Sequence, residues 1–183
     1  MNVENVVGTG SLGREVDLEA LASDLSTEYI NFNPDNYHGL YIRLAEQGPL
    51  ITLYRSGSYN ISGANSVEDL KLTKDGLLEL LYRMGVIGEA LDESFEIVNV
   101  VCTAEIGHPI DLTNLAVELG LNQTEYEPEQ FPGLVYRPDH GKWVILIFGS
   151  GRIVVVGADS VDTAQDAYRS LLGQINQESA KSD

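Results

Sequence analysis

Two kinds of hydrophobic pattern alternate along the chain. Strict alternation of apolar and polar residues predicts strands, and the segments that show it are residues 3–9, 39–44, 50–54 and 58–62. Apolar residues three and four positions apart predict helices at residues 16–25 and 66–84. Asp17 suits the dipole at the start of the first helix, and Ser66 with Asp69 predicts an N-cap for the second. The first half therefore reads strand, helix, several strands and helix.

The second half of the chain repeats the first at a constant offset. Asn5 aligns with Asn99 and Gly63 with Gly157, and both differences (99 − 5 and 157 − 63) equal 94. Further pairs at this offset, with no gap, are Asp17/Asp111, Pro34/Pro128, Gly39/Gly133, Arg43/Arg137 and Ser66/Ser160. Chance matches would scatter over many offsets, so the single offset indicates a tandem duplication.

The duplication sets the expected domain organisation. We expect a first repeat at residues 1–91, a second at 95–176 that ends in a helix over residues 160–175, and a frayed tail at 177–183. Two independent domains or a two-blade array are alternatives, but each half is short for much independent stability and no long linker separates them. The expected fold class is α+β: a pseudo-twofold saddle of two tandem repeats, with a continuous curved antiparallel sheet and helices on the convex face.

Alternation along the strands sorts the side chains of the second repeat onto two faces, and both are mostly apolar. The natural helix-covered core contains Val98, Val100, Leu134, Tyr136, Ile145, Ile147, Ile153 and Val155. The other face contains Ile97, Asn99, Val101, Thr103, Phe131, Val135, Val144, Leu146, Phe148, Val154 and Val156. The free face of an antiparallel sheet is normally polar, so an apolar one predicts a binding surface. There are two alternatives. This face could form a homodimer interface, or helices whose position the pattern predicts wrongly could cover it.

The charge balance bears on the partner of this face. With 28 acidic and 11 basic residues the net charge is −17, which by itself argues against nucleic acid. Acidic, lysine-poor surfaces are also typical of proteins from salt-loving microbes, where a Debye length of about 3 Å at molar salt screens repulsion from phosphates. Arg137, Ser150 and Arg152 lie at the rim of the apolar face, within reach of phosphates. Charge alone therefore leaves the class of partner open.

The remaining composition narrows the class of protein. A single cysteine, Cys102, excludes an internal disulfide and suits a reducing interior, so we expect a cytoplasmic protein. No segment approaches the roughly 20 apolar residues needed to cross a bilayer. The first residues lack the basic start and apolar run of a signal peptide, and we expect no membrane partner.

Three segments of the second repeat resemble the repeat of TATA-box-binding proteins of the archaeal, halophilic type. They are IVNVV (97–101), YEPEQFPGLVYR (126–137) and LIFGSGRIVVVGADS (146–160), and the resemblance extends over essentially the whole chain. It implies a general transcription initiation factor, without enzymatic activity or cofactor, that binds and bends A/T-rich promoter (TATA) DNA in the minor groove. It also implies transcription factor B as a partner, RNA polymerase as an indirect partner, and homodimer formation as an option without DNA.

The resemblance assigns roles to individual residues. The aromatic residues at the wedge positions are Tyr37, Tyr54, Phe131 and Phe148. Asn5 and Asn99 match the central asparagines that bond to minor-groove acceptors, and Glu127 and Glu129 match the acidic loop residues that meet transcription factor B. The remaining implied DNA contacts are Val7, Arg43, Ser56, Ser62, Val101, Arg137, Leu146, Ser150, Arg152, Val154 and Val156.

The first repeat departs from the family pattern in its wedges and in its face. Tyrosine replaces phenylalanine at both wedge positions, and a buried tyrosine hydroxyl needs a partner or water. Polar or tyrosine side chains stand where the second repeat has aliphatic ones, and they are Tyr41, Thr52, Asn60 and Ser62. Ser58 replaces a usual basic residue, and Val156 a usual threonine. We therefore expect a weaker first-half grip, which calls full bending by both halves into question.

Two weaker signals predict no site. Residues 8–13, GTGSLG, fit the dinucleotide fingerprint after a strand, but residues 102–107 lose the first two glycines and no parallel β-α-β unit follows. His38, His108 and His140 are not spaced as metal ligands, and the carboxylates are too scattered for acid–base catalysis, so we expect neither metal nor enzyme. Alternation turns the Cys102 side chain toward the core.

Two other functions fit the residues. A diverged paralogue that acts mainly as a protein-interaction module, with weak DNA binding, would suit the tyrosines and the polar first half. A small-molecule carrier or enzyme that uses the sheet as a pocket floor is the other alternative. The open apolar face and the scattered carboxylates disfavour it.

Overall fold

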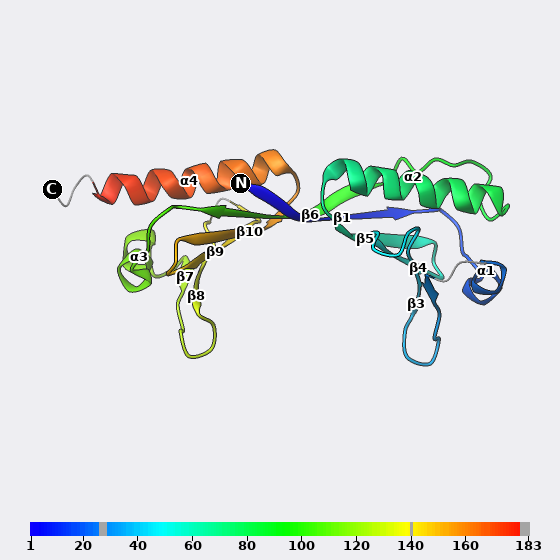
Figure 1. The fold of residues 1–183 in the computed structure, drawn as a ribbon, viewed down its shortest axis with the longest axis horizontal. Coiled ribbons are helices and arrows are strands. Elements are labelled where there is room, and N and C mark those ends of the chain that lie inside the picture. The colour runs from blue at the N-terminus through cyan, green and yellow to red at the C-terminus, as the bar shows by residue number, and fades with distance from the viewer. Residues whose placement is uncertain (26–28, 140, 180–183) are drawn as a thin grey trace. The chain divides into compact units, whose positions relative to one another are not determined.

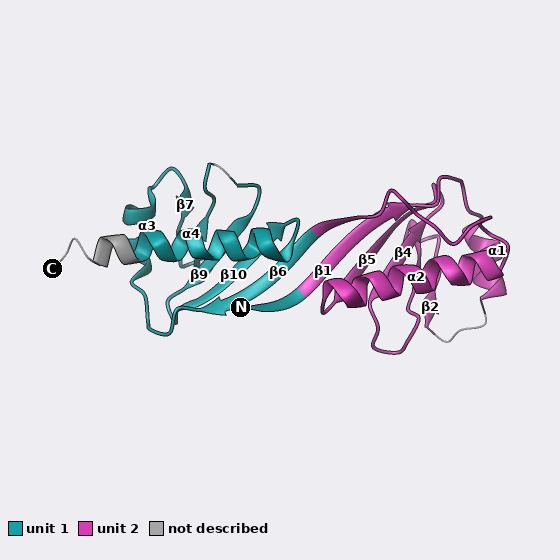
Figure 2. Cartoon of the chain, turned by 90° about the horizontal axis from the view of Figure 1, so that it is seen from above, with its two compact units in different colours: residues 1–4, 99–183 teal, residues 5–98 magenta. Residues whose placement is uncertain are grey.

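The computed structural model describes residues 1–25, 29–139 and 141–179 (Figure 1). The chain forms two compact units, which Figure 2 distinguishes by colour. We call residues 5–98 the N-terminal unit, and residues 1–4 with 99–183 the C-terminal unit. Residues 1–4 thus belong to the C-terminal unit, although the first strand begins within them.

The N-terminal unit contains an antiparallel sheet and two helices. Its elements are β1 (Asn2–Ser11, from residue 5 on), α1 (Leu18–Asp24), β2 (Ile30–Asn31), β3 (Gly39–Ile42), β4 (Leu50–Tyr54), β5 (Ser58–Ala64) and α2 (Val67–Arg83). The strand order is β2-β3-β4-β5-β1. Each strand from β2 to β5 runs antiparallel to its neighbour, and residues 32–38, 43–49 and 55–57 connect these strands.

The C-terminal unit repeats this arrangement element by element. Its elements are β6 (Glu96–Glu105, from residue 99 on), α3 (Leu112–Leu119), β7 (Thr124–Glu125), β8 (Gly133–Tyr136), β9 (Val144–Phe148), β10 (Arg152–Ala158) and α4 (Val161–Ser179). The strand order is β6-β10-β9-β8-β7. Every strand has the bounds of its counterpart plus 94 (for example 152 − 58), so the offset in the sequence is also an offset in the structure.

The observed elements agree with the predicted ones and add to them. The four strands predicted in the first repeat are present with small shifts at their ends, and the helix after Ser66 ends at Arg83 as expected. The two-residue strands β2 and β7 are new, because two residues are too few to show alternation. Helix α4 continues to Ser179, past the expected end at residue 175. Residues 180–183 of the expected frayed tail lie outside the described residues.

Side chains cap the helix starts as the sequence indicates. Asp17 Oδ1 accepts hydrogen bonds from Glu19 N–H and Ala20 N–H, both at 3.1 Å, so it is the N-cap of α1 and not a residue inside the helix. Ser66 Oγ accepts from Asp69 N–H at 3.0 Å at the start of α2. Each cap satisfies backbone N–H groups that the helix itself leaves unpaired, which stabilises the helix by about 1 kcal/mol.

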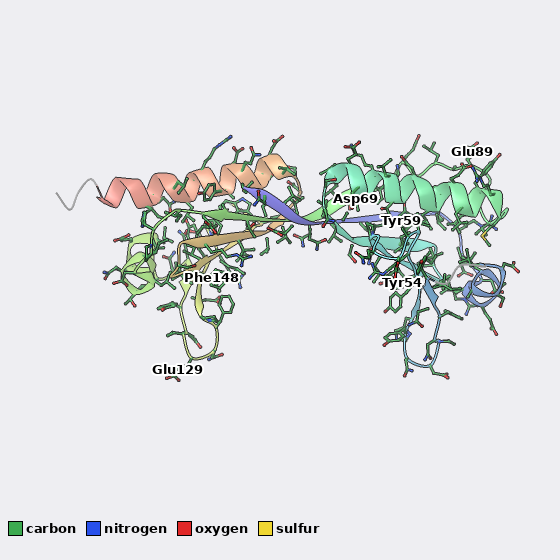
Figure 3. The ribbon with its side chains drawn as sticks, viewed as in Figure 1. Tyr54, Tyr59, Asp69, Glu89, Glu129 and Phe148 are labelled. Carbon is green, nitrogen blue, oxygen red and sulfur yellow. The ribbon has the colours of Figure 1, made fainter. Side chains whose placement is uncertain are left out.

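The core of each unit lies between its sheet and its helices. The helices pack on one sheet face in both units, and Tyr59 lies between the sheet and α2 (Figures 1 and 3). Of the side chains predicted for the core face of the second repeat, all but Val98 are buried. The prediction for Val98 is wrong: it is 43% exposed. Strand β10 pairs with β6 only from Val100 onward, so Val98 precedes the covered part of β6.

The segment before β6 packs on β1 within the N-terminal unit. A Cβ at Gly8 would collide with the Phe95 ring, and a Cβ at Gly10 would collide with Asp92 and the Tyr59 ring. Gly8 and Gly10, the first two glycines of the GTGSLG stretch, therefore make room for this segment. This packing gives the fingerprint-like spacing a structural reason, and the antiparallel pairing of β1 with β5 excludes the βαβ unit that a dinucleotide site needs.

Asp92 anchors that segment through a buried hydrogen-bond cluster. Tyr59 Oη donates to Asp92 Oδ2 at 2.7 Å, Ser11 N–H donates to the same oxygen at 3.0 Å, and Ser94 donates to Oδ1 through both N–H and Oγ. Burial by itself would raise the pKa of Asp92, but these hydrogen bonds outweigh it, so the pKa lies below its usual value. Burial, followed by the bond to Asp92, raises the pKa of Tyr59 far above the usual range.

Candidate nucleic-acid interface

The open face of each unit, which is the sheet face opposite the helices, remains partly exposed to solvent. In the C-terminal repeat, every side chain that alternation placed on this face is partly exposed, from Asn99 on β6 to Val156 on β10. Tyr54 and Phe148 lie on the same side, away from the helices of their units (Figure 3). The predicted apolar face is therefore not buried within its own unit.

One row of side chains crosses the open face at the same place in both units, and we call it the central row. In the N-terminal unit the cross-strand neighbours from β3 to β1 are Tyr41, Thr52, Asn60 and Thr9. In the C-terminal unit the equivalent neighbours from β8 to β6 are Val135, Leu146, Val154 and Thr103. The backbone register is the same, but the row is polar and aromatic in one unit and mainly aliphatic in the other.

The predicted wedge residues border the central row. Phe131 and Phe148 meet edge to face, with ring centroids 5.7 Å apart and an interplanar angle of 64°. Tyr37 makes the same kind of contact with Tyr41 at 5.3 Å, and it is 46% exposed. The two phenylalanines thus support each other as a pair, whereas Tyr37 packs against a member of the central row.

The backbone holds Asn5 and Asn99 in one orientation. Gly63 N–H donates to Asn5 Oδ1 at 2.9 Å, and Gly157 N–H donates to Asn99 Oδ1 at 2.8 Å. Both glycines lie at a bulge, where β5 and β10 shift register against β1 and β6. Their φ angles of 84° and 80° belong to the left-handed region that glycine adopts without strain. Neither glycine was recognised from the sequence as part of the site, although both recur in the repeat.

These hydrogen bonds decide which end of each asparagine meets a ligand. A side-chain amide carries one acceptor oxygen and one NH₂ donor, and a backbone N–H can pair only with the oxygen. In Asn5 and Asn99 the oxygen is therefore engaged, and Nδ2 is the group that remains available. Both side chains are partly exposed. Each unit thus presents a fixed hydrogen-bond donor among the apolar side chains of its open face.

Two of the three predicted serines, Ser56 and Ser150, lie in tight turns at the end of the sheet, and the third, Ser62, is a partly exposed residue of β5. Gly57 N–H donates to Tyr54 O at 2.9 Å, which closes the turn that contains Ser56. Leu12 N–H donates to Gly57 O at 2.9 Å, so the loop after β1 holds this turn in place. Equivalent bonds around Gly151 hold Ser150. Both serines are exposed, and each also accepts a hydrogen bond within its turn, Ser56 Oγ from Ser58 N–H and Ser150 Oγ from Arg152 N–H, both at 3.3 Å.

The predicted arginines differ in the contacts that their side chains already make. Arg43 is partly exposed, and its Nη1 donates to Gly48 O within its own hairpin. Arg137 Nε lies 3.5 Å from Glu125 Oε1 in an exposed ion pair, which contributes little stability and leaves the guanidinium available to a ligand. Arg152 is exposed at the start of β10. All three remain candidates for phosphate contacts.

Two further arginines lie near the turn of the N-terminal unit and were not predicted. Arg55 begins the turn itself, and Arg14 lies in the loop that binds it, because a Cβ at Gly57 would collide with Arg14 O. Both are exposed. Their counterparts Gly149 and His108 carry no fixed charge, so comparing the two repeats does not reveal Arg55 and Arg14. A search for local positive charge would have found both arginines.

Glu127 and Glu129 lie in the loop between β7 and β8. Gln130 N–H and Phe131 N–H both donate to Glu127 O at 2.9 Å, and the Gln130 side chain donates to the Glu127 carboxylate. Both glutamates are exposed, and Glu129 lies at the tip of its loop (Figure 3). The loop is thus an ordered, acidic projection that also carries the wedge residue Phe131.

Other chemistry is limited within the described part of the chain. The described residues hold no group of three or more His, Cys, Asp or Glu side chains that could bind a metal ion. His140 lies outside them. Cys102 is fully buried, as predicted, and burial raises the pKa of its thiol. None of the helices in the described segments is both long and apolar enough to span a membrane.

Comparisons with known proteins agree with this geometry. A family model described as transcription factor TFIID (or TATA-binding protein, TBP) matches residues 1–84 and 94–177. The chain is 48% identical over 177 residues to TATA-box-binding protein C of Halobacterium salinarum, covering 97% of this chain and 98% of that protein. It is 41% identical over 178 residues to TATA-box-binding protein 2 of Haloferax volcanii, covering 96% and 93%.

A solved structure extends the likeness to the fold. Methanococcus jannaschii TBP superposes with a TM-score of 0.80 at 35% identity, and the match covers 96% of this chain and 98% of that one. The α+β class with two tandem repeats, predicted from the sequence, is confirmed. Sequence, fold and the repeated site all lead to one conclusion: the chain belongs to the TATA-box-binding protein family.

Proposed function

We propose that this protein is a general transcription initiation factor that binds A/T-rich promoter DNA through its two open faces, in the minor groove, and bends it. The observation that carries the proposal is an unburied sheet face with a fixed amide donor in each repeat, and in the C-terminal repeat this face is mainly apolar. Proteins that read the minor groove insert apolar wedges between base steps, and TATA-box-binding proteins are themselves the standard example of this mode.

The fixed donors favour A·T pairs. In the minor groove both A·T and T·A present only acceptors, the adenine N3 and the thymine O2. Because Asn5 and Asn99 offer Nδ2, each can donate to such an edge, and neither needs to reorient when DNA binds. Phe131 and Phe148 supply adjacent rings for a wedge, while Arg137 and the turn serines supply phosphate contacts at the rim.

The acidic loop of the C-terminal unit supports a second part of the proposal. Glu127 and Glu129 project into solvent on an ordered loop, which suits a basic surface on a protein partner. We assign this loop to transcription factor B, which in turn recruits RNA polymerase. Substitution of both glutamates by glutamine is expected to leave binary DNA binding unchanged and to weaken the ternary complex with transcription factor B.

DNA binding at high KCl tests the proposal. With a net charge of −17 the protein releases few counterions from DNA, and added salt screens its repulsion from phosphates. We expect affinity for a TATA duplex to stay flat or to rise from low to molar KCl, with bending measured by energy transfer between labelled duplex ends. A G/C-rich duplex of equal length is the control. A steep loss of affinity with salt would refute this mode of binding.

The polar central row of the N-terminal unit favours one alternative, a paralogue that mainly holds protein partners and binds DNA weakly. An electrophoretic shift with TATA DNA, with and without transcription factor B, separates the two. The main proposal predicts a shift by the protein alone at molar KCl. The alternative predicts a shift only when transcription factor B is present.

A further inference from the structure

The central rows of the two units share a backbone register but differ in side chain at three of four positions, and two of these three form a cross-strand pair. Thr52 and Asn60 are cross-strand partners on β4 and β5, and Leu146 and Val154 are the equivalent partners on β9 and β10. The pairing register on both sides of each pair is the same in the two units. The two faces thus offer different chemistry at one place, and this difference bears on which base pairs each face accepts.

The minor groove carries one feature that distinguishes G·C from A·T, namely the exocyclic amino group of guanine, which is a hydrogen-bond donor. An aliphatic pair such as Leu146 and Val154 would bury that donor without a partner. A buried polar group that loses its hydrogen bond destabilises the complex, so the C-terminal face disfavours G·C. An acceptor at the same place would remove this penalty.

Asn60 and Thr52 are such acceptors. Asn60 is exposed, and no hydrogen bond from its side chain to another described residue is present. Its amide is therefore able to turn the oxygen toward a donor, in contrast to Asn5, whose oxygen Gly63 engages. Next to it on β1, the partly exposed Thr9 donates its hydroxyl proton to Tyr59 O at 3.2 Å, so its oxygen keeps only acceptor capacity for a ligand.

We propose that the open face of the N-terminal unit accepts a G·C pair in its half of the binding site, with Asn60 Oδ1 and Thr52 Oγ1 accepting from the guanine amino group. The C-terminal unit, with Leu146 and Val154 at these places, requires A·T pairs in its half. The inference rests on the proposed function and specifies its ligand: a mixed site with one strict half and one tolerant half.

A modified base isolates the relevant group. In 2,6-diaminopurine an amino group is added to adenine in the minor groove, so the base still pairs with thymine while it presents the donor that guanine presents. The test uses a self-complementary A/T duplex, on which the protein is free to bind in either direction. Single adenines are replaced in one half, or at symmetric positions in both halves, and affinity is measured by fluorescence anisotropy at molar KCl.

The wild-type protein is expected to bind the duplex modified in one half within about threefold of the parent, because it turns its tolerant unit to that half. It should lose about tenfold or more on the duplex modified in both halves. The matched variant Thr52→Leu/Asn60→Val copies the C-terminal unit, and it should lose about tenfold on the duplex modified in one half as well. The reciprocal variant Leu146→Thr/Val154→Asn should recover binding to the doubly modified duplex.

The outcomes separate this inference from the function on which it rests. If the wild-type protein binds the parent duplex but loses as much affinity as Thr52→Leu/Asn60→Val when one half is modified, the tolerant half does not exist and the inference is overturned. If no variant binds the parent duplex, the proposed function itself fails. Thermal denaturation of each free variant confirms that a loss of binding is not a loss of fold.

Discussion

The two units of this protein share a backbone and differ in what the backbone presents. Strand bounds, register and the bulge glycines repeat at the offset of 94 residues. The central row is polar and aromatic in the N-terminal unit and mainly aliphatic in the C-terminal unit, and the wedges are tyrosines in one and phenylalanines in the other. A duplicated scaffold therefore keeps the positions of its contacts while each copy changes their chemistry.

The helix-covered faces also differ, for a related reason. In the N-terminal unit Gly8, Gly10 and Tyr59 accommodate the segment that contains Asp92 and Phe95, whose ring stacks on Tyr59 with centroids 6.1 Å apart. In the C-terminal unit the equivalent positions are Cys102, Ala104 and Ile153, which are larger than glycine or apolar. Only one copy needs to hold the connecting segment, so only that copy keeps the glycines and the buried carboxylate.

The largest expected effect comes from removing the wedges. Phe131→Ala/Phe148→Ala should weaken DNA binding by about a hundredfold, since stacking against a base contributes roughly 1–3 kcal/mol for each ring. Tyr37→Ala/Tyr54→Ala should weaken binding by only about tenfold, because the hydroxyls already reduce the gain from insertion. Anisotropy titration at molar KCl measures both. Equal losses for the two pairs would show that the units grip DNA alike.

The central asparagines provide the next test. Asn99→Asp keeps an oxygen for Gly157 N–H but replaces the free donor by an acceptor, which would face the acceptors of an A·T pair. We expect about tenfold weaker binding or more, and a smaller loss for Asn5→Asp in the weaker unit. The melting temperature of the free protein serves as the control, and a DNA affinity that survives Asn99→Asp would contradict the donor role.

Asp92 gives the N-terminal unit a buried hydrogen-bond cluster that has no counterpart among the described residues of the C-terminal unit. Asp92→Asn should lower the free energy of unfolding by about 1–3 kcal/mol at neutral pH. In the wild-type protein N–H and O–H groups donate to both carboxylate oxygens, and the variant would place an amide NH₂ donor against some of these donors. The neighbouring exposed Glu93→Gln is the matched control. Denaturation in urea gives both values, and an equal, small effect of the two substitutions would contradict an anchoring role for Asp92.

The same carboxylate predicts a pH dependence. The pKa of Asp92 is lower in the folded protein than its usual value, so its contribution to stability is present above the usual pKa of about 4. That contribution is lost as the pH falls through the folded pKa. The stability difference between the wild-type protein and Asp92→Asn should therefore shrink on acidification, and a difference that is constant with pH would contradict this assignment.

The smallest expected effect comes from the tyrosine hydroxyls. Tyr37→Phe/Tyr54→Phe gives the N-terminal unit the wedges of the C-terminal unit and removes two hydroxyls that otherwise need partners on insertion. We expect TATA DNA to bind about fivefold more tightly, with a larger bend measured by energy transfer, because the two hydroxyls together oppose insertion by about 1 kcal/mol. Unchanged or weaker binding would show that the hydroxyls find partners in the complex.

Much of the site follows from the sequence, and the exceptions share a cause. Alternation placed Leu146, Val154 and Phe148 on the open face, because strand periodicity is a local property. It misplaced Val98, since the end of the covered region depends on where β10 stops pairing. It also left Gly8 and Gly10 without a role, because their partners Phe95 and Asp92 are some 80 residues away in the chain.

The sequence by itself determined the duplication, the elements and the two faces of each sheet, because each depends on a short-range pattern or on identity at one offset. Only the tertiary structure decided which end of Asn5 and Asn99 faces a ligand, since the N–H groups of Gly63 and Gly157 reach them through strand pairing across 58 residues. It alone also brought Thr52, Asn60 and Thr9 into one row. Contacts between distant segments depend on register, and register is set when the sheet forms.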